Sequence, residues 1–246
     1  MNAAGMHSRP RRPSRAQGAG AKSIAGRNLI AIDGPAGAGK STAARRLAAA
    51  LGFTYVDSGA MYRAVGLAAR RLGIDPDDAA AVADLVAQIT FVADPKGTRV
   101  LLDGTDVTAD LRATDAGVWA SRIATHALVR ERLVERQRAL AADGAIVMDG
   151  RDIGTVVFPD ARYKFFLTAH AEERARRRQA QDAGSGIASD VTTARREIDA
   201  RDRRDRQRAI APLRPAVDAI VIDNSALTPE MVVARMLETV RARARP

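Results

Sequence analysis

Cysteine is absent from this chain of 246 residues, aromatic residues make up only 4% of it, and histidine occurs three times. Without cysteine the chain has no disulfide, no thiol nucleophile and no thiolate metal ligand. The three histidines, His7, His126 and His170, are scattered along the sequence and form no metal-ligand motif. We therefore expect neither redox chemistry nor a zinc site.

Long apolar runs are also missing. No run approaches the roughly 20 residues that a transmembrane helix needs, and the N-terminus lacks the apolar core of a secretory signal. We therefore expect a cytoplasmic protein without a membrane partner. The apolar content of 46% over 246 residues is enough for one substantial α/β core.

The net charge of +10 is concentrated at the two ends of the chain. Residues 1–27 contain five arginines and one lysine but no acidic residue, and 241–245 add three more arginines. The segment 1–27 is rich in Arg, Pro, Gly, Ala and Ser, which predicts a disordered basic tail. Because the remaining body is close to neutral, we expect no nucleic-acid partner.

Lysine is scarce, since only four of the 39 basic residues are lysine, and Lys40 is one of them. It is the seventh residue of the pattern "GPAGAGKS" at 34–41, which follows an apolar stretch at 29–32 and precedes an Ala/Leu-rich helical pattern. Such a loop points backbone N–H groups at phosphate oxygens, the lysine reaches the β- and γ-phosphates, and Ser41 is a Mg²⁺ ligand. The predicted ATP-binding residues are Gly34, Pro35, Ala36, Gly37, Ala38, Gly39, Lys40, Ser41 and Thr42.

Phosphate loops serve GTPases, motor ATPases and small-molecule kinases alike. A GTPase would need an Asn-Lys-x-Asp guanine reader, which the sequence does not contain. A nucleic-acid motor would need a larger chain with a basic binding face, whereas the body of this chain is close to neutral. The sequence therefore favours a small-molecule kinase.

Two further polar clusters follow apolar stretches, at positions where open α/β sheets bind ligands. In "TYVDSGAMYR" Ser58 is placed to cap a helix and Arg63 follows within two turns. A ligand site is the favoured interpretation of the pair, and a cap with a surface charge is the alternative. In "AIVMDGRDIG" the cluster comprises Asp149, Arg151 and Asp152. Asp149 is placed to orient Mg²⁺ through water.

Together "DGPAGAGKST", "DSGAMYR", "DGRDIGTVVFPDA" and "RDRRDRQRAIAPL" strongly resemble the bacterial cytidylate kinases. The resemblance implies transfer of phosphate from ATP to CMP or dCMP, with Mg²⁺. It also implies a P-loop NTPase fold of three α/β/α layers with a parallel central sheet, within a kinase domain at 28–246. A small β-containing monophosphate-binding insert is expected at about 84–125, with a hairpin turn at Asp103-Gly104, and a short lid at about 179–193. We expect a monomer.

The family's site residues carry over by position. Residues implied around the cytosine ring are Ser58, Arg130, Asp152 and Arg208. Residues implied at the sugar are Ser121, Arg201 and Asp205, and those at the acceptor phosphate are Arg63 and Arg151. The implied catalytic charges are Lys40, Arg151, Arg201 and Arg208. Which of Arg174, Arg177 and Arg178 meets ATP stays open.

The Arg-rich stretch "ARDRRDRQRA" at 200–209 has two interpretations. On a helix, Arg201, Asp205 and Arg208 share one stripe, while Arg203 and Arg206 point away from it. A substrate-facing helix and a wholly solvated charge run both fit this pattern. At the level of function, a UMP or AMP kinase and a nucleic-acid-binding ATPase are the alternatives to a CMP kinase.

Overall fold

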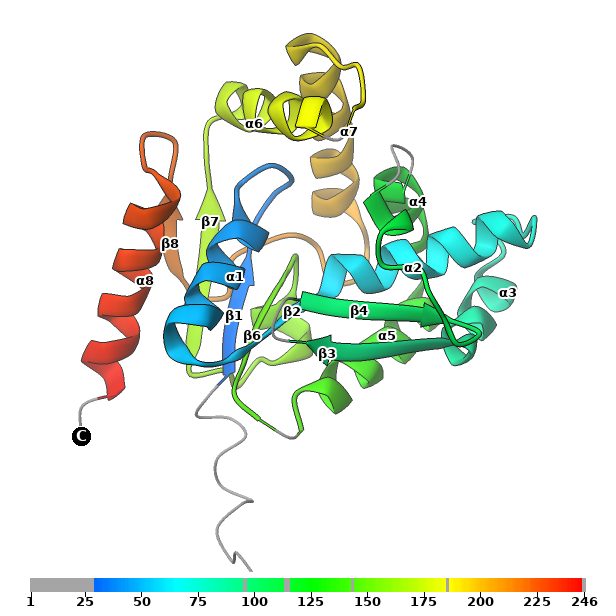
Figure 1. The fold of residues 1–246 in the computed structure, drawn as a ribbon, viewed down its shortest axis with the longest axis horizontal. Coiled ribbons are helices and arrows are strands. Elements are labelled where there is room, and N and C mark those ends of the chain that lie inside the picture. Colours follow the sequence, from blue (N-terminus) through cyan, green and yellow to red (C-terminus); the bar gives the residue numbers. More distant parts are fainter. Residues whose placement is uncertain (1–28, 95–96, 113–115, 143, 185, 245–246) are drawn as a thin grey trace, which may run out of the picture.

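The computed structural model describes residues 29–94, 97–112, 116–142, 144–184 and 186–244 (Figure 1). The basic tail expected at 1–27 lies outside these residues. Among the residues described, no helix has the length and apolar character needed to cross a membrane.

A single eight-stranded sheet organises the chain, in the order β5-β4-β3-β2-β6-β1-β7-β8. The five neighbouring strands β2, β6, β1, β7 and β8 run parallel, as expected from the sequence. Their bounds are β2 (Thr54–Asp57), β6 (Ile146–Gly150), β1 (Leu29–Asp33), β7 (Tyr163–Thr168) and β8 (Ile220–Asp223). Because they are parallel, the carboxyl ends of β1, β2 and β6 meet at one edge, and Asp57 lies beside Asp149 in the register.

Helices cover both faces of the parallel strands. On one face α1 (Lys40–Leu51) and α8 (Pro229–Ala244) pack their apolar stripes, including Leu47 and Met236, against Ile30, Ile32 and Phe165. On the other face α5 (Ala127–Leu140) contributes Val134 to a second apolar layer. The strands read as near-continuous apolar runs because both faces are buried. The α/β three-layer fold predicted from the sequence is confirmed.

The remaining three strands extend the same sheet in antiparallel fashion. They are β3 (Ile89–Asp94), β4 (Gly97–Leu102) and β5 (Thr105–Asp106). Asp103 and Gly104 form the turn between β4 and β5 with φ of 48° and 79°, the left-handed conformation of a tight two-residue hairpin. The hairpin turn expected there is confirmed. Its strands belong to the central sheet, because β3 pairs with β2 through Asp94 and Tyr55.

The helices α2 (Ser58–Arg71), α3 (Ala79–Asp84) and α4 (Ala116–Ile123) pack beside this extension. Above the carboxyl ends of the parallel strands lie α6 (Ala171–Gly184) and α7 (Val191–Gln207), at the top of Figure 1. The two helices extend into the segment 179–193, where a short lid is expected from the sequence, since α6 ends at Gly184 and α7 begins at Val191. Gly186, with φ of 74°, follows the end of α6, and the Asp190 side chain caps α7 by accepting from the Thr193 N–H at 2.9 Å.

Candidate active site

The loop 34–39 connects β1 to α1 and is closely surrounded by other parts of the chain. A Cβ atom on Gly34 would lie 2.1 Å from the backbone oxygen of Leu167, so only glycine fits. Lys40 is buried, and its Nζ donates to the Pro35 carbonyl oxygen at 2.7 Å, which curls the loop around the ammonium group. Burial, and then the nearby Arg151, lower the pKa of Lys40 to about 7. The phosphates of a nucleotide would supply negative charge beside this ammonium group and so favour its protonated form.

Oxygen donors gather beside this loop. Ser41 Oγ and Tyr55 OH each donate to one carboxylate oxygen of Asp149, both at 2.8 Å. Burial, and then the neighbouring Asp57, raise the pKa of Asp149 to about 6. A hydroxyl and a carboxylate are hard oxygen donors of the kind Mg²⁺ prefers, so these residues fit that cation. A cation here would favour the ionised form of Asp149.

Asp57, and not Ser58, caps α2, which corrects the capping role considered from the sequence. One Asp57 oxygen accepts from the Ala60 N–H at 2.9 Å, and the other pairs with Arg63 at 2.9 Å. Because Asp57 ends β2, its carboxylate is already aimed at the first turn of the helix. The Ser58 hydroxyl is therefore used elsewhere, and donates to the Asp149 backbone oxygen at 2.6 Å.

A buried charge cluster joins three of the residues implied around the cytosine ring. Arg130 pairs with one carboxylate oxygen of Asp152, and Arg208 Nη2 lies 3.5 Å from the other. The three side chains are only 4–7% exposed. Arg208 Nη2 has no hydrogen-bond partner within the described part of the chain, so a buried donor is left for a ligand.

The Arg-rich helix α7 turns its stripe toward these residues. Asp205 is buried and accepts from Arg151 Nε at 2.9 Å, whereas Arg203 and Arg206 are exposed. Arg208 leaves the helix as its C-cap, with ψ of 138°, and thereby reaches Asp152. The solvated-run interpretation therefore holds for one face of α7 only.

Arg201 is the least satisfied member of this stripe. Its Nε is buried and finds no hydrogen-bond partner among the residues described. Burial, and then the charge of Arg151, lower the pKa of Arg201 to about 9. Ser121 lies alongside, where its Oγ accepts from Arg204 Nε at 3.1 Å. A substrate-sized anion would relieve both the unpaired N–H group and the repulsion between cations.

Of the three arginines of α6 left open by the sequence, Arg174 is buried and bonds to the Ala36 carbonyl oxygen at 3.0 Å. Arg177 donates to Asn224 Oδ1 at 2.9 Å, and Arg178 Nε to Asp182 at 3.1 Å. The charge of Arg178 also acts on Arg201.

Two buried carboxylates were missed in the sequence. Asp33 accepts from the backbone N–H groups of Ile153 and Gly154 at 2.8 and 2.7 Å, and so holds the π-helical turn Ile153–Val157 that follows Arg151 and Asp152. Asp202 accepts from the Ala36 N–H at 3.0 Å. For Asp33 the signal was its place at the end of an apolar strand. For Asp202 it was its position three residues before Asp205, on a neighbouring part of the helix.

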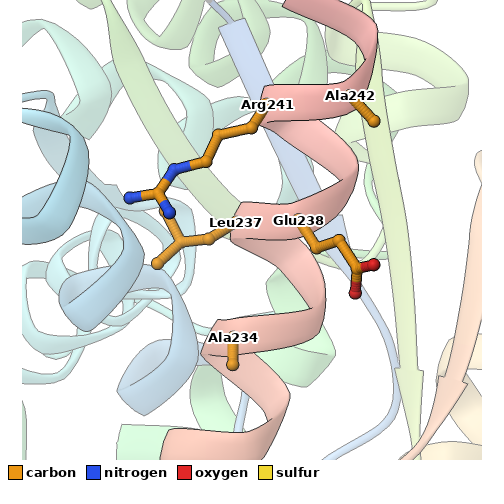
Figure 2. A pocket seen from close by; sticks show the side chains of 5 residues that line it. All are labelled: Ala234, Leu237, Glu238, Arg241 and Ala242. Atoms are coloured by element: carbon orange, nitrogen blue, oxygen red, sulfur yellow. The ribbon is translucent and has the colours of Figure 1, made fainter.

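A surface hollow elsewhere is of a different kind (Figure 2). Its lining comes from α8 alone and consists of Ala234, Leu237, Glu238, Arg241 and Ala242. None of the predicted site residues contributes to it. The charged groups that could bind two nucleotides therefore lie at the carboxyl edge of the sheet and under α7.

Comparison with known proteins gives consistent matches along the chain. A family model described as cytidylate kinase matches residues 30–242. The cytidylate kinase of Pelotomaculum thermopropionicum is 51% identical over 216 residues, 87% of this chain and 96% of that protein. Cytidylate kinases of Geobacillus kaustophilus and of a Geobacter species are 49% and 46% identical, again over 87% of this chain and over 96% and 93% of theirs.

Proposed function

The chain belongs to the cytidylate kinase family, and we propose that it transfers the γ-phosphoryl group of ATP to CMP and dCMP, forming CDP or dCDP and ADP. The observation that carries the proposal is the convergence of Lys40, Arg151, Arg201 and Arg208 around one region. The charges of Arg151 and Arg201 both act on Lys40, and Arg201 Nε has no hydrogen-bond partner among the described residues. Such a cluster suits a triphosphate and a monophosphate dianion held against each other.

ATP would bind through residues 34–42, which comprise the loop and the N-terminus of α1 and supply N–H groups and the positive end of a helix dipole. Mg²⁺, when bound, neutralises charge on the phosphate oxygens. Ser41 would be its protein ligand, and Asp149 would orient it through water. The hydrogen bond from Tyr55 keeps the Asp149 carboxylate in position for this role.

The cytosine ring would lie against Ser58, Arg130, Asp152 and Arg208. Cytosine offers an N4 amino donor beside N3 and O2 acceptors, which a carboxylate and a guanidinium can match. Uracil reverses the roles of the groups at positions 4 and 3, which leaves an acceptor facing the buried carboxylate. The structure supports this assignment because Asp152 and Arg208 are buried and adjacent, and because Arg208 keeps an unpaired N–H group.

The sugar would contact Ser121, Arg201 and Asp205, and the acceptor phosphate would contact Arg63 and Arg151. In the structure Arg63 is paired with Asp57, and Arg151 with Asp205. Each arginine therefore already has a carboxylate that fixes its direction. A phosphate can use the remaining N–H groups of the planar guanidinium without breaking the pair.

The chemistry needs no general base. The CMP phosphate is mostly a dianion at neutral pH, and one of its oxygens attacks the γ-phosphorus of ATP directly. A new P–O bond forms as the bond from the γ-phosphorus to the β-γ bridging oxygen breaks, and ADP leaves with that oxygen. Lys40, Arg151 and Arg201 stabilise the charge spread over the transferring group. The helices α6 and α7 above the loop would keep water away.

A panel of acceptors tests the proposal. ADP release is measured with ATP, Mg²⁺ and each of CMP, dCMP, UMP and AMP, and separately with RNA or DNA. We expect CMP and dCMP to be the preferred acceptors. Preference for UMP or AMP would make the protein another nucleoside monophosphate kinase. Stimulation by nucleic acid, with none by CMP, would reject the kinase proposal altogether.

A further inference from the structure

Asp202 and Arg174 form a buried ion pair on the phosphate loop. The two side chains are only 5–6% exposed and come from α7 and α6. Asp202 Oδ1 accepts from the Ala36 N–H, and Arg174 Nη1 donates to the Ala36 carbonyl oxygen, both at 3.0 Å. Both backbone polar groups of one loop residue are therefore held by one pair of charges.

The next loop residue, Gly37, is closely packed against α6 and α7. A Cβ atom built on Gly37, which has φ of 72°, would lie 2.9 Å from the Arg174 backbone oxygen and 3.3 Å from Ile198 Cδ1. Helices α6 and α7 thus both press on the loop at consecutive positions. A shift of α7 along its axis would therefore displace Ala36 and Gly37, whose peptide groups lead into the phosphate-binding turn.

A buried ion pair is weak evidence of a stabilising role, because the desolvation of two charges offsets most of their attraction. Two of the three Arg174 guanidinium nitrogens are already engaged within the protein, since Nε donates to the Ala169 carbonyl oxygen at 3.2 Å and Nη1 bonds to Ala36 and Asp202. The pair therefore calls for a positional explanation.

The same helix carries the acceptor side of the site. Asp202 directly follows Arg201 and lies three residues before Asp205, which is paired with Arg151. One rigid helix therefore touches the donor loop through Asp202 and the acceptor residues through its neighbours. The charge of Asp202 also acts on Lys40.

We propose that Asp202, supported by Arg174, is a positioning residue that links the donor and acceptor sites, so that CMP bound against α7 tightens the binding of ATP to the loop. The proposal rests on the proposed function. By thermodynamic reciprocity ATP would tighten the binding of CMP by the same factor. Asp202 contacts neither substrate and acts through Ala36.

The test measures this factor. The dissociation constant of a non-hydrolysable ATP analogue with Mg²⁺ is determined by calorimetry with and without saturating CMP, for the wild type, Asp202→Asn and the double variant Asp202→Asn/Arg174→Gln. The matched control is Asp199→Asn, which removes a carboxylate of the same helix that is 46% exposed and paired with Arg195. The double variant removes both charges, so it stays informative if Asp202→Asn alone fails to fold.

We expect CMP to tighten analogue binding by at least about fivefold in the wild type and in the control, within the usual range of such linkage. In both Asp202 variants the dissociation constants of the analogue measured without and with CMP should differ by less than about twofold. The dissociation constant for CMP alone should change by less than about threefold in these variants. A wild-type ratio of one overturns the proposal, as does an unchanged ratio in the double variant. Equal weakening of both ligands together with a lower Tm also overturns it and assigns the pair to folding. CMP phosphorylation by the wild type, measured in parallel, tests the proposed function separately.

Discussion

Replacement of Arg201 by methionine should raise the free energy of unfolding of the substrate-free protein and lower kcat/KM for CMP. The Arg201 side chain has a buried Nε without a hydrogen-bond partner in the described part of the chain, and burial, followed by the charge of Arg151, lowers its pKa to about 9. Methionine keeps much of the length and apolar contact of the arginine stem but removes the charge. Arg203, two residues further along α7 and exposed, provides the matched control.

The two effects have different sizes. Replacing buried ion pairs by apolar residues of similar volume is neutral to stabilising by about 1–4 kcal/mol, because charges no longer have to be desolvated. Arg201 is a single charge that forms no ion pair with the described residues and is only partly buried, so we expect its replacement to gain about 1–2 kcal/mol. In a chain of this length about 1–2 kcal/mol raises the Tm by roughly 2–8 °C. A lost charge-assisted hydrogen bond to substrate costs about 1.5–3 kcal/mol, or roughly 10–150-fold in kcat/KM for CMP.

Thermal unfolding without ligands and steady-state ADP release with CMP measure both quantities on the same preparations. Arg203→Met should leave kcat/KM within about twofold and shift the Tm by little, as is usual for an exposed position. Equal losses of activity in the two variants would refute the substrate-facing stripe of α7. A lower Tm in Arg201→Met would refute the argument that this guanidinium is held at a cost without substrate.

Three further changes test other parts of the site. Lys40→Ala should reduce phosphoryl transfer by several orders of magnitude with the far-ultraviolet circular dichroism unchanged, because its ammonium acts on phosphate charge; near-normal turnover would remove the loop from the donor site. Asp152→Asn should narrow the preference for CMP over UMP by about 1–3 kcal/mol, since an amide can present a donor or an acceptor, and the ratio of the two kcat/KM values measures it. An unchanged ratio would assign Asp152 to holding Arg130 in place. Burial raises the pKa of Asp33 to about 7 from 3.8, so the folded state keeps a proton that the unfolded chain releases above about pH 4. As the pH rises from about 4 to 7, the free energy of unfolding of the wild type should therefore fall relative to that of Asp33→Asn, by at most about 1.4 kcal/mol per pH unit. Urea titrations of both proteins measure this difference, and parallel pH profiles would contradict it.

Much of the fold follows from local patterns. The apolar run before Gly34, the glycine-rich loop and the helical pattern after Lys40 are contiguous, and each depends on backbone geometry over a few residues. The turn at Asp103-Gly104 is local in the same way. The place of β3 in the central sheet does not follow from a local pattern. It depends on the pairing of Tyr55 in β2 with Asp94 in β3, and the residue pattern of neither strand specifies the strand with which it pairs.

Capping shows how closely spaced residues can still be misassigned. Both Asp57 and Ser58 have side chains that cap helices well, and the sequence favoured Ser58 because the predicted strand ends at Asp57. In the structure α2 begins one residue earlier than this predicts, so Asp57 takes the cap and also pairs with Arg63. Helix starts shift by a residue at little cost in local energy, and tertiary contacts decide between the options.

The sequence by itself determined the phosphate loop, the parallel α/β order and, through resemblance, the residues proposed to meet CMP. Only the tertiary structure decided what supports them. Asp202 and Ala36 are 166 positions apart, and Asp33 and Ile153 are 120 apart. A motif records which residues recur near one another along the chain, whereas a buried carboxylate is satisfied by whichever N–H groups the packed fold brings within about 3 Å.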